Sequence, residues 1–174
     1  MNYEAIIKQV RDIPDFPKPG ILFKDLTTVF KNEVSLQALS DELYHLYKDK
    51  GITKVVGIES RGFIMGAILA SRLGAGFIPI RKPGKLPADT WQESFEKEYG
   101  IDTIEIHRDA LSESDTILLH DDLLATGGTM IAAANLVRRF NPQKIYINFL
   151  SEIVALNGRA ELPADIEVET LLKF

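Results

Sequence analysis

The sequence has no cysteine, and it holds 12 glycines and 8 prolines among 174 residues. The lack of cysteine excludes a disulfide scaffold, a zinc site built on thiolates and a thiolate nucleophile. It also fits a reducing compartment such as the cytosol. The glycine and proline content is well below the share of about 25% that is typical of low-complexity chains. The absences therefore favour an ordinary globular protein.

Long apolar runs and an excess of positive charge are also missing. No run approaches the roughly 18 apolar residues that are needed to span a bilayer. The first eight residues lack the basic-then-apolar order of an export signal. The net charge of −5 has the wrong sign for a protein that mainly coats nucleic acid. We therefore expect a cytoplasmic protein with neither a membrane nor a nucleic acid as its partner.

The sequence does contain enough apolar residues for one buried core, with 45% hydrophobic and 26% charged residues. At roughly 150 residues per domain, the length predicts a single domain over 1–174. Short apolar runs and longer periodic segments alternate along the chain. They predict strands over 54–58, 77–80, 116–119 and 144–150, and helices over 63–73 and 129–140. This alternation predicts an α/β fold with an open, mostly parallel sheet flanked by helices.

Other segments do not follow this alternation. The first apolar residues recur at helical spacing and predict a helix that ends at Pro14. A second helix is predicted from an N-cap at Ser35 to Gly51. The stretch 81–107 is too long for a plain connection and predicts a flexible flap. After Leu162, scattered apolar residues predict an edge strand.

The segment from Leu118 to Thr129 joins an apolar strand to a glycine-rich helix start. In an open parallel sheet, ligands bind at the carboxyl ends of the strands. Gly127 and Gly128 let the backbone approach an anion closely, while Thr126 adds a hydroxyl donor at the positive end of the helix. The segment therefore predicts a phosphate site. No lysine follows the glycines, which argues against a Walker loop for a nucleoside triphosphate.

Two adjacent acids, Asp121 and Asp122, lie just before the glycines. Their carboxylates suit the hydroxyls of a ribose and the neighbourhood of a magnesium ion. The plainer interpretation is a glycine-rich helix start with solvated acids, but two acids, a strand and the following glycine motif together favour function. His120 precedes the acids, and a semi-buried, non-ligating histidine is the favoured interpretation of it.

Together, the apolar strand, the two acids and the sequence ATGGT resemble the signature that binds phosphoribosyl pyrophosphate (PRPP) in type I phosphoribosyltransferases. Further motifs in family order are similar to the branch that acts on adenine: FPKPGILFKD at 16–25, SRGF at 60–63, RKPGKLP at 81–87 and EYG at 98–100. The resemblance covers about residues 10 to 160. It implies the type I fold, with a small N-terminal hood over 1–34 that binds the base and a flexible flap over 81–107. It also implies a purine-salvage enzyme that joins adenine to PRPP, giving AMP and pyrophosphate.

The resemblance also implies most of the site. The ribose and 5′-phosphate of PRPP would be bound by Asp121, Asp122, Ala125, Thr126, Gly127, Gly128 and Thr129. The diphosphate would be bound by Ser60, Arg61, Arg81, Lys82 and Lys85. Adenine would be bound by Leu22, Phe23 and Lys24, with the ring of Phe23 stacked on the purine.

Three catalytic residues are implied by the same resemblance. Glu98 would manage a proton near the adenine nitrogens, Tyr99 would close over the site, and Arg61 would meet the diphosphate from a turn with a non-proline cis peptide. Magnesium would be held by Asp121 and Asp122 through water. The family also implies a homodimer.

Two other functions share these motifs. A PRPP-sensing regulator could keep the fold and lose catalysis, although an acidic chain of this length has no room for a DNA-binding module. An enzyme for another purine, such as hypoxanthine or xanthine, would differ mainly in the base pocket.

Overall fold

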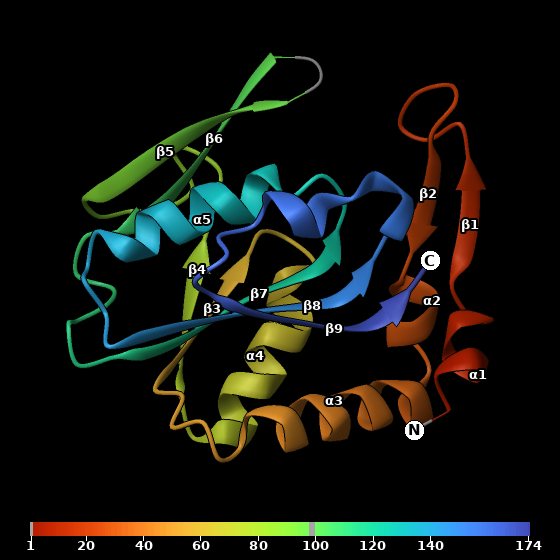
Figure 1. Ribbon diagram of the computed structural model, residues 1–174, viewed down its shortest axis with the longest axis horizontal. Coiled ribbons are helices and arrows are strands. Elements are labelled where there is room, and N and C mark those ends of the chain that lie inside the picture. Colours follow the sequence, from red (N-terminus) through yellow and green to blue (C-terminus); the bar gives the residue numbers. More distant parts are fainter. Residues whose placement is uncertain (1, 98–99) are drawn as a thin grey trace. The chain divides into compact units, whose positions relative to one another are not determined.

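The structure is a computed structural model that describes residues 2–97 and 100–174 (Figure 1). The chain divides into two units, Met1–Leu46 and Tyr47–Phe174. The hood expected over residues 1–34 falls within the first unit and the flap expected over residues 81–107 within the second. None of the helices in the described part of the chain is long and apolar enough to cross a membrane.

The first unit begins with a short helix and a two-stranded sheet. Helix α1 (Tyr3–Ile7) is capped by the side chain of Asn2, which accepts a hydrogen bond from the amide of Ala5 at 3.2 Å. Strand β1 (Arg11–Pro14) then pairs antiparallel with β2 (Leu22–Asp25). The predicted N-terminal helix is confirmed over Tyr3–Ile7, but its expected end at Pro14 is wrong, because Arg11–Pro14 uses its backbone hydrogen bonds for pairing with β2.

Two helices complete the first unit, α2 (Thr27–Phe30) and α3 (Glu33–Tyr47). The predicted N-cap of α3 is also wrong. The side chain of Asn32 accepts a hydrogen bond from the amide of Ser35 at 2.9 Å, and the hydroxyl of Ser35 donates to Gln9 at 2.8 Å. Asparagine is as good an N-cap as serine, and its position three residues earlier starts the helix sooner.

The second unit is built on a five-stranded parallel sheet with the strand order β4-β3-β7-β8-β9. Its strands are β3 (Lys54–Ile58), β4 (Gly76–Ile80), β7 (Thr116–Leu124), β8 (Lys144–Glu152) and β9 (Glu167–Lys173). The predicted open parallel sheet and the edge strand after Leu162 are thereby confirmed. The third predicted strand is longer than expected, because β7 continues through both acids to Leu124.

Helices α4 (Gly62–Leu73) and α5 (Gly128–Arg138) flank this sheet (Figure 1). The chain goes from β3 through α4 to β4, and from β7 through α5 to β8, so the two crossovers run in opposite directions along the sheet. Right-handed crossovers in opposite directions place the two helices on opposite faces. Gly74 ends α4 in the left-handed conformation, with φ of 66°.

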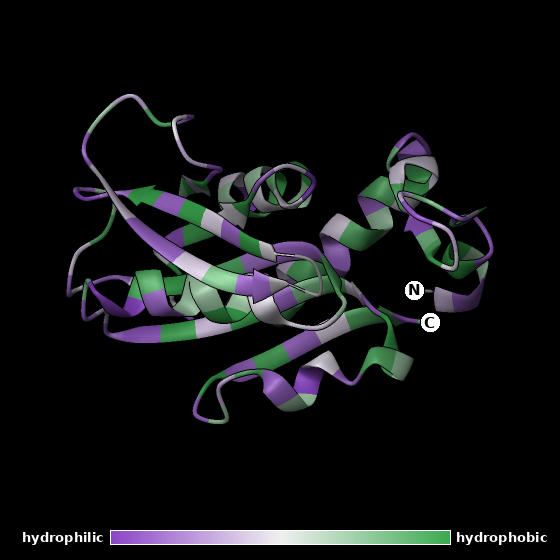
Figure 2. Cartoon of the chain, turned by 90° about the horizontal axis from the view of Figure 1, so that it is seen from above, coloured by the Kyte–Doolittle hydropathy of each residue, from purple (hydrophilic) through white to green (hydrophobic). Residues whose placement is uncertain are grey.

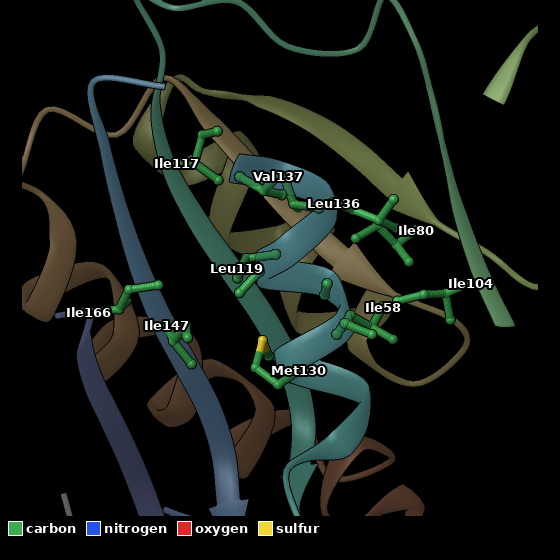
Figure 3. Close-up of a cluster of buried hydrophobic side chains, with 14 of the residues drawn as sticks. Ile58, Ile80, Ile104, Ile117, Leu119, Met130, Leu136, Val137, Ile147 and Ile166 are labelled. Atoms are coloured by element: carbon green, nitrogen blue, oxygen red, sulfur yellow. The ribbon is translucent and has the colours of Figure 1, made fainter. Parts of the chain in front are cut away.

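The main core lies between the sheet and α5 (Figure 3). Alternate residues of β7, Ile117 and Leu119, are fully buried there and face Met130, Leu136 and Val137 on α5. Apolar burial of this extent is the main stabilising contribution to such a domain. It fixes the start of α5 against the end of β7.

The stretch 81–107 forms an antiparallel hairpin of β5 (Thr90–Lys97) and β6 (Gly100–His107). Hydrophilic and hydrophobic residues alternate along it (Figure 2). The ring of Trp91 packs against Phe140 with centroids 4.6 Å apart, and Phe95 also packs against the core. Both aromatic side chains therefore pack the hairpin against the core.

Two short 3-10 helices, η1 (Val154–Leu156) and η2 (Gly158–Glu161), connect β8 to β9. The backbone of Ile153 still hydrogen-bonds to the carbonyl of Leu124 at 2.9 Å. This connection therefore starts next to the end of β7.

Candidate active site

The strand order reverses at β3, which pairs with β4 on one side and β7 on the other. The segments that follow β3 and β7 therefore leave the sheet side by side and lead to helices on opposite faces. Such a switch point at the carboxyl ends of parallel strands is the usual ligand site of an open α/β sheet. The predicted SRGF and acid-and-glycine motifs both lie here.

One cavity at this point, which we call the charged cavity, has a volume of about 330 Å³. It is lined by Ile58, Glu59, Ser60, Arg61, Ile80, Arg81, Lys82, Ile104, Asp121, Asp122, Leu123 and Thr129. Of the five residues predicted to bind a diphosphate, Ser60, Arg61, Arg81 and Lys82 come together in its wall. Lys85 is exposed and lies outside this set.

Arg61 reaches across the charged cavity to one of the acids. Its Nε lies 2.7 Å from Oδ2 of Asp122, which is 5% exposed. The peptide bond between Glu59 and Ser60 is cis, so that expectation is confirmed. The turn after β3 thus brings Arg61, which is predicted to bind the diphosphate, into direct contact with Asp122, which is predicted to bind the ribose.

Glu59 is a functional candidate that the sequence analysis missed. Its carboxylate accepts hydrogen bonds from Arg81 Nε at 3.2 Å, Arg81 Nη2 at 3.0 Å and the amide of Lys82 at 3.0 Å. These bonds, chiefly the one from Arg81, lower the pKa of Glu59. Lys82 pairs through its side chain with Asp102 on β6. The sequence did offer a signal for Glu59, because it directly follows a predicted strand, where ligand-binding residues of a parallel sheet lie.

Asp121 and Asp122 lie where the sheet meets the cavity. Burial and the neighbouring charge of Asp122 raise the pKa of Asp121 well above its ordinary value. Burial also raises the pKa of Asp122, while the guanidinium of Arg61 acts in the opposite direction. The two acids therefore share a site in which a further positive charge would be favourable.

A second, smaller cavity of about 80 Å³, which we call the loop cavity, adjoins the glycines. It is lined by Asp121, Leu123, Leu124, Ala125, Thr126, Gly127, Gly128, Thr129, Met130 and Phe149. All five residues from Ala125 to Thr129 that were predicted to bind a phosphate come together here. Asp121, Leu123 and Thr129 line both cavities.

The loop cavity opens onto the start of α5. Gly127 takes the left-handed conformation, with φ of 89°, and no side chain caps the helix. The first amides of a helix have no partner within it, and the helix dipole makes this end positive. An anion in the loop cavity would therefore meet backbone N–H groups rather than the side chain of a lysine or an arginine.

The residues predicted to bind adenine lie on β2 in the first unit. Phe23 is partly buried, and its ring meets Phe16 edge to face with centroids 5.1 Å apart. Leu22 is half exposed, and the side chain of Lys24 pairs with Asp12 at 2.7 Å. The predicted catalytic residues Glu98 and Tyr99 lie outside the residues that the structure describes.

His120 is buried between β7 and α4 and takes no part in either cavity. Its Nδ1 lies 2.8 Å from Oδ1 of Asn148 on β8. Burial lowers the pKa of His120 to about 4, so the imidazole is neutral at pH 7. The described residues contain no group of three or more ligand-type side chains that could hold a metal without help from a substrate.

Comparison with known proteins agrees with this geometry. The model of the phosphoribosyl transferase domain matches residues 25–159, which include both cavities. The chain therefore belongs to the phosphoribosyltransferase family.

Individual relatives are more specific. An adenine phosphoribosyltransferase of Bacteroides fragilis is 64% identical, over 100% of this chain and 99% of the relative. The crystal structure of adenine phosphoribosyltransferase from Rhodothermus marinus superimposes with a TM-score of 0.94 at 48% identity, covering 99% of this chain and 98% of that one. The Giardia lamblia enzyme in complex with 9-deazaadenine gives a TM-score of 0.95 at 44% identity, covering 100% and 98%. Within the family, the chain thus belongs to the adenine phosphoribosyltransferase branch.

Proposed function

We propose that this protein transfers the 5-phosphoribosyl group of PRPP to adenine, releasing AMP and pyrophosphate, as a purine-salvage enzyme. The observation that carries the proposal is the pair of adjoining cavities at the end of β7. PRPP has a phosphate at one end, a ribose in the middle and a diphosphate at the other. The loop cavity, the two acids and the charged cavity supply a matching series of binding groups.

The 5′-phosphate is assigned to the loop cavity. Its donors are the amides at the start of α5 and the hydroxyls of Thr126 and Thr129. The ribose hydroxyls are assigned to Asp121 and Asp122, which accept hydrogen bonds. A sugar held at both its phosphate and its hydroxyls keeps its anomeric carbon at a fixed place, which lowers the entropic cost of reaction.

The diphosphate is assigned to the charged cavity, with Ser60, Arg61, Arg81 and Lys82 as its donors and Lys85 at its edge. Guanidinium groups bind phosphate oxygens through two parallel hydrogen bonds. The carboxylates that pair with these cations must give way when the diphosphate arrives. Binding of PRPP thus exchanges internal ion pairs for ion pairs with the substrate.

Magnesium fits the charged cavity as a partner of the substrate. Magnesium is commonly bound by one or two carboxylates together with substrate phosphates, and it keeps several waters. Asp121 and Asp122 provide two adjacent carboxylates, and the raised pKa of each favours a nearby cation. The ion would supply charge neutralisation of the leaving diphosphate.

The bond that breaks joins the anomeric carbon to a diphosphate oxygen, and the bond that forms joins the same carbon to an adenine nitrogen. Positive charge develops on the sugar ring, as in glycoside cleavage. Asp121 and Asp122 place negative charge near that ring, while Arg61 stabilises the departing diphosphate. Glu98 is assigned to take up the proton that adenine loses, and Tyr99 to cover the site.

Adenine is assigned to Leu22, Phe23 and Lys24, with stacking on Phe23 and main-chain hydrogen bonds at the other two residues. The relative from Giardia lamblia, which was crystallised with 9-deazaadenine, supports an adenine-like ligand. Main-chain groups that match the amino group of adenine would be left unpaired by hypoxanthine. This provides selectivity among purines.

The test is to mix the protein with magnesium, PRPP and one purine at a time, and to follow nucleotide formation. We expect AMP from adenine and no nucleotide from hypoxanthine, guanine or xanthine. Binding of PRPP without any product would instead favour a sensing regulator. Product from another purine would favour a different base specificity. Omission of magnesium should abolish turnover.

We also propose that the protein is a cytoplasmic homodimer, which the family likeness supports. Light scattering should then give a mass twice the 19.5 kDa of one chain. A single-chain mass at working concentration would contradict the dimer without affecting the proposed reaction.

A further inference from the structure

Gly158 lines neither cavity, but it lies in contact with residues 125–127, the loop that leads into α5. A Cβ atom added to Gly158 would lie 2.0 Å from the carbonyl oxygen of Ala125 and 2.9 Å from the carbonyl carbon of Thr126. A Cβ atom added to Gly127 would in turn lie 3.0 Å from the carbonyl oxygen of Gly158. Two glycines from distant parts of the sequence thus allow two backbones to touch.

Space alone explains the glycine at position 158. Its backbone lies outside the left-handed region, in contrast to Gly127 with φ of 89°. Alanine at position 158 would therefore cost nothing in backbone strain. It would force the carbonyl of Ala125 to move, because that atom belongs to the backbone and cannot rotate away.

The segment that carries Gly158 is firmly attached to the sheet. Arg159 donates to Glu152 at 2.9 Å, to Thr170 at 2.9 Å and to the carbonyl of Val168 at 3.0 Å. Glu152 is 5% exposed, and the guanidinium of Arg159 lowers its pKa. Helix η2 is thus fixed to the end of β8 and to β9, the strands that lie beyond β7 in the sheet.

We propose that Gly158 is a positioning residue for the 5′-phosphate, with Arg159 as its anchor. Gly158 contacts the loop away from the loop cavity, and it holds the loop where its amides and those of α5 converge on one anion. The inference rests on the proposed function, because it takes the loop cavity as the phosphate site. The inference gives a supporting role to a residue that lies outside the motifs of the family resemblance.

The main test replaces Gly158 by alanine and measures two ligands by calorimetry, AMP and magnesium pyrophosphate. AMP carries the 5′-phosphate of the loop cavity, whereas pyrophosphate belongs in the charged cavity. We expect Gly158→Ala to weaken AMP binding about tenfold or more and to leave pyrophosphate binding within about twofold. The KM for PRPP should rise, while the KM for adenine stays near that of the parent.

Ala160→Gly is the matched control, since it loosens the same 3-10 helix at an exposed position without adding an atom. We expect it to leave the affinity for both ligands unchanged. Equal weakening of both ligands by Gly158→Ala, or unchanged AMP binding in the folded variant, would overturn the inference. If the parent protein bound neither ligand, the proposed function itself would be wrong.

If the Gly158→Ala protein does not fold, a second pair of variants tests the same inference. Arg159→Met removes the anchor but adds no atoms near the loop, and Arg159→Lys retains the charge. We expect weaker AMP binding in Arg159→Met, partial recovery in Arg159→Lys and constant pyrophosphate binding in both. AMP binding that is unchanged in Arg159→Met would contradict the role of the anchor.

Discussion

The two adjoining cavities at the end of β7 differ in the groups that they offer to an anion. The charged cavity is lined by cations that already have acidic partners: Arg61 with Asp122, Arg81 with Glu59 and Lys82 with Asp102. Among the described residues, the loop cavity is lined by no lysine or arginine. Its proposed donors are backbone amides and hydroxyls at the junction of β7 and α5.

The proposed assignment of the diphosphate to the charged cavity and of the 5′-phosphate to the loop cavity accounts for this difference. Side-chain ion pairs can exchange partners, which suits a diphosphate that arrives on the substrate and leaves as product. Backbone amides at a helix start cannot exchange or move far, which suits a phosphate that stays on the ribose throughout. The exchange of ion-pair partners in the charged cavity and the fixed amides of the loop cavity can be tested separately.

The largest expected effect comes from the acids between the cavities. Changing both Asp121 and Asp122 to asparagine should lower kcat/KM at least about a hundredfold, because it removes the charge near the reacting ribose and the partner of Arg61. AMP formation measures the loss. Asp165→Asn, which removes an exposed ion pair with Arg138, is the control that should retain activity. Near-normal turnover of the double variant would show that these acids are misassigned.

Arg81→Met should weaken binding in the charged cavity and leave binding in the loop cavity unchanged. Loss of charge-assisted hydrogen bonds to the diphosphate should weaken pyrophosphate binding roughly tenfold to a hundredfold. AMP, which contains no diphosphate, should bind as before. Arg138→Met on the surface of α5 should change neither affinity. A similar loss for AMP and for pyrophosphate would mean that Arg81 serves the ribose phosphate as well.

Thr126→Val should have a smaller effect, confined to the loop cavity. One hydroxyl among several donors is worth about 1 kcal/mol, so the KM for PRPP should rise about fivefold. The KM for adenine should not change. Thr126→Ser keeps the hydroxyl and should restore the parent value. If both KM values rose together, the hydroxyl would not be acting on the phosphate.

The sequence predicted the parallel sheet and the loop cavity because local patterns determine both. Apolar runs of strand length indicate buried parallel strands, and ATGGT contains the glycines and hydroxyls of the helix start in consecutive positions. The end of the first helix at Pro14 and the N-cap at Ser35 were wrong for an equally local reason. A helical spacing of apolar residues near Pro14 did not reveal that β1 would find a pairing partner in β2.

The parts that the sequence did not predict depend on contacts between distant residues. Glu59 gains its importance from Arg81, and Gly158 gains its importance from Ala125, neither of which is near its partner in the sequence. Lys85, the fifth residue of the predicted basic set, has an exposed side chain, and its carbonyl accepts a hydrogen bond from Arg81 at 3.1 Å.

The smallest expected effect concerns stability and its dependence on pH. The hydrogen bonds from Arg81 lower the pKa of Glu59 in the folded protein below its ordinary value of 4.5. The pair therefore contributes stability above about pH 4.5, and this contribution is lost as the pH falls through the lowered pKa. Glu59→Gln should reduce the free energy of unfolding by about 1 kcal/mol at pH 7, with a smaller difference at pH 3.

Denaturant unfolding at both pH values measures this change, and Thr126→Val serves as its control. The hydroxyl of Thr126 carries no charge at either pH, so the stability difference of Thr126→Val should be the same at pH 7 and pH 3. A Glu59→Gln difference that is also constant with pH would mean that the ion pair adds nothing to stability. The carboxylate would then serve only to hold Arg81 until the diphosphate replaces it, and the contrast between exchangeable and fixed donors would rest on binding alone.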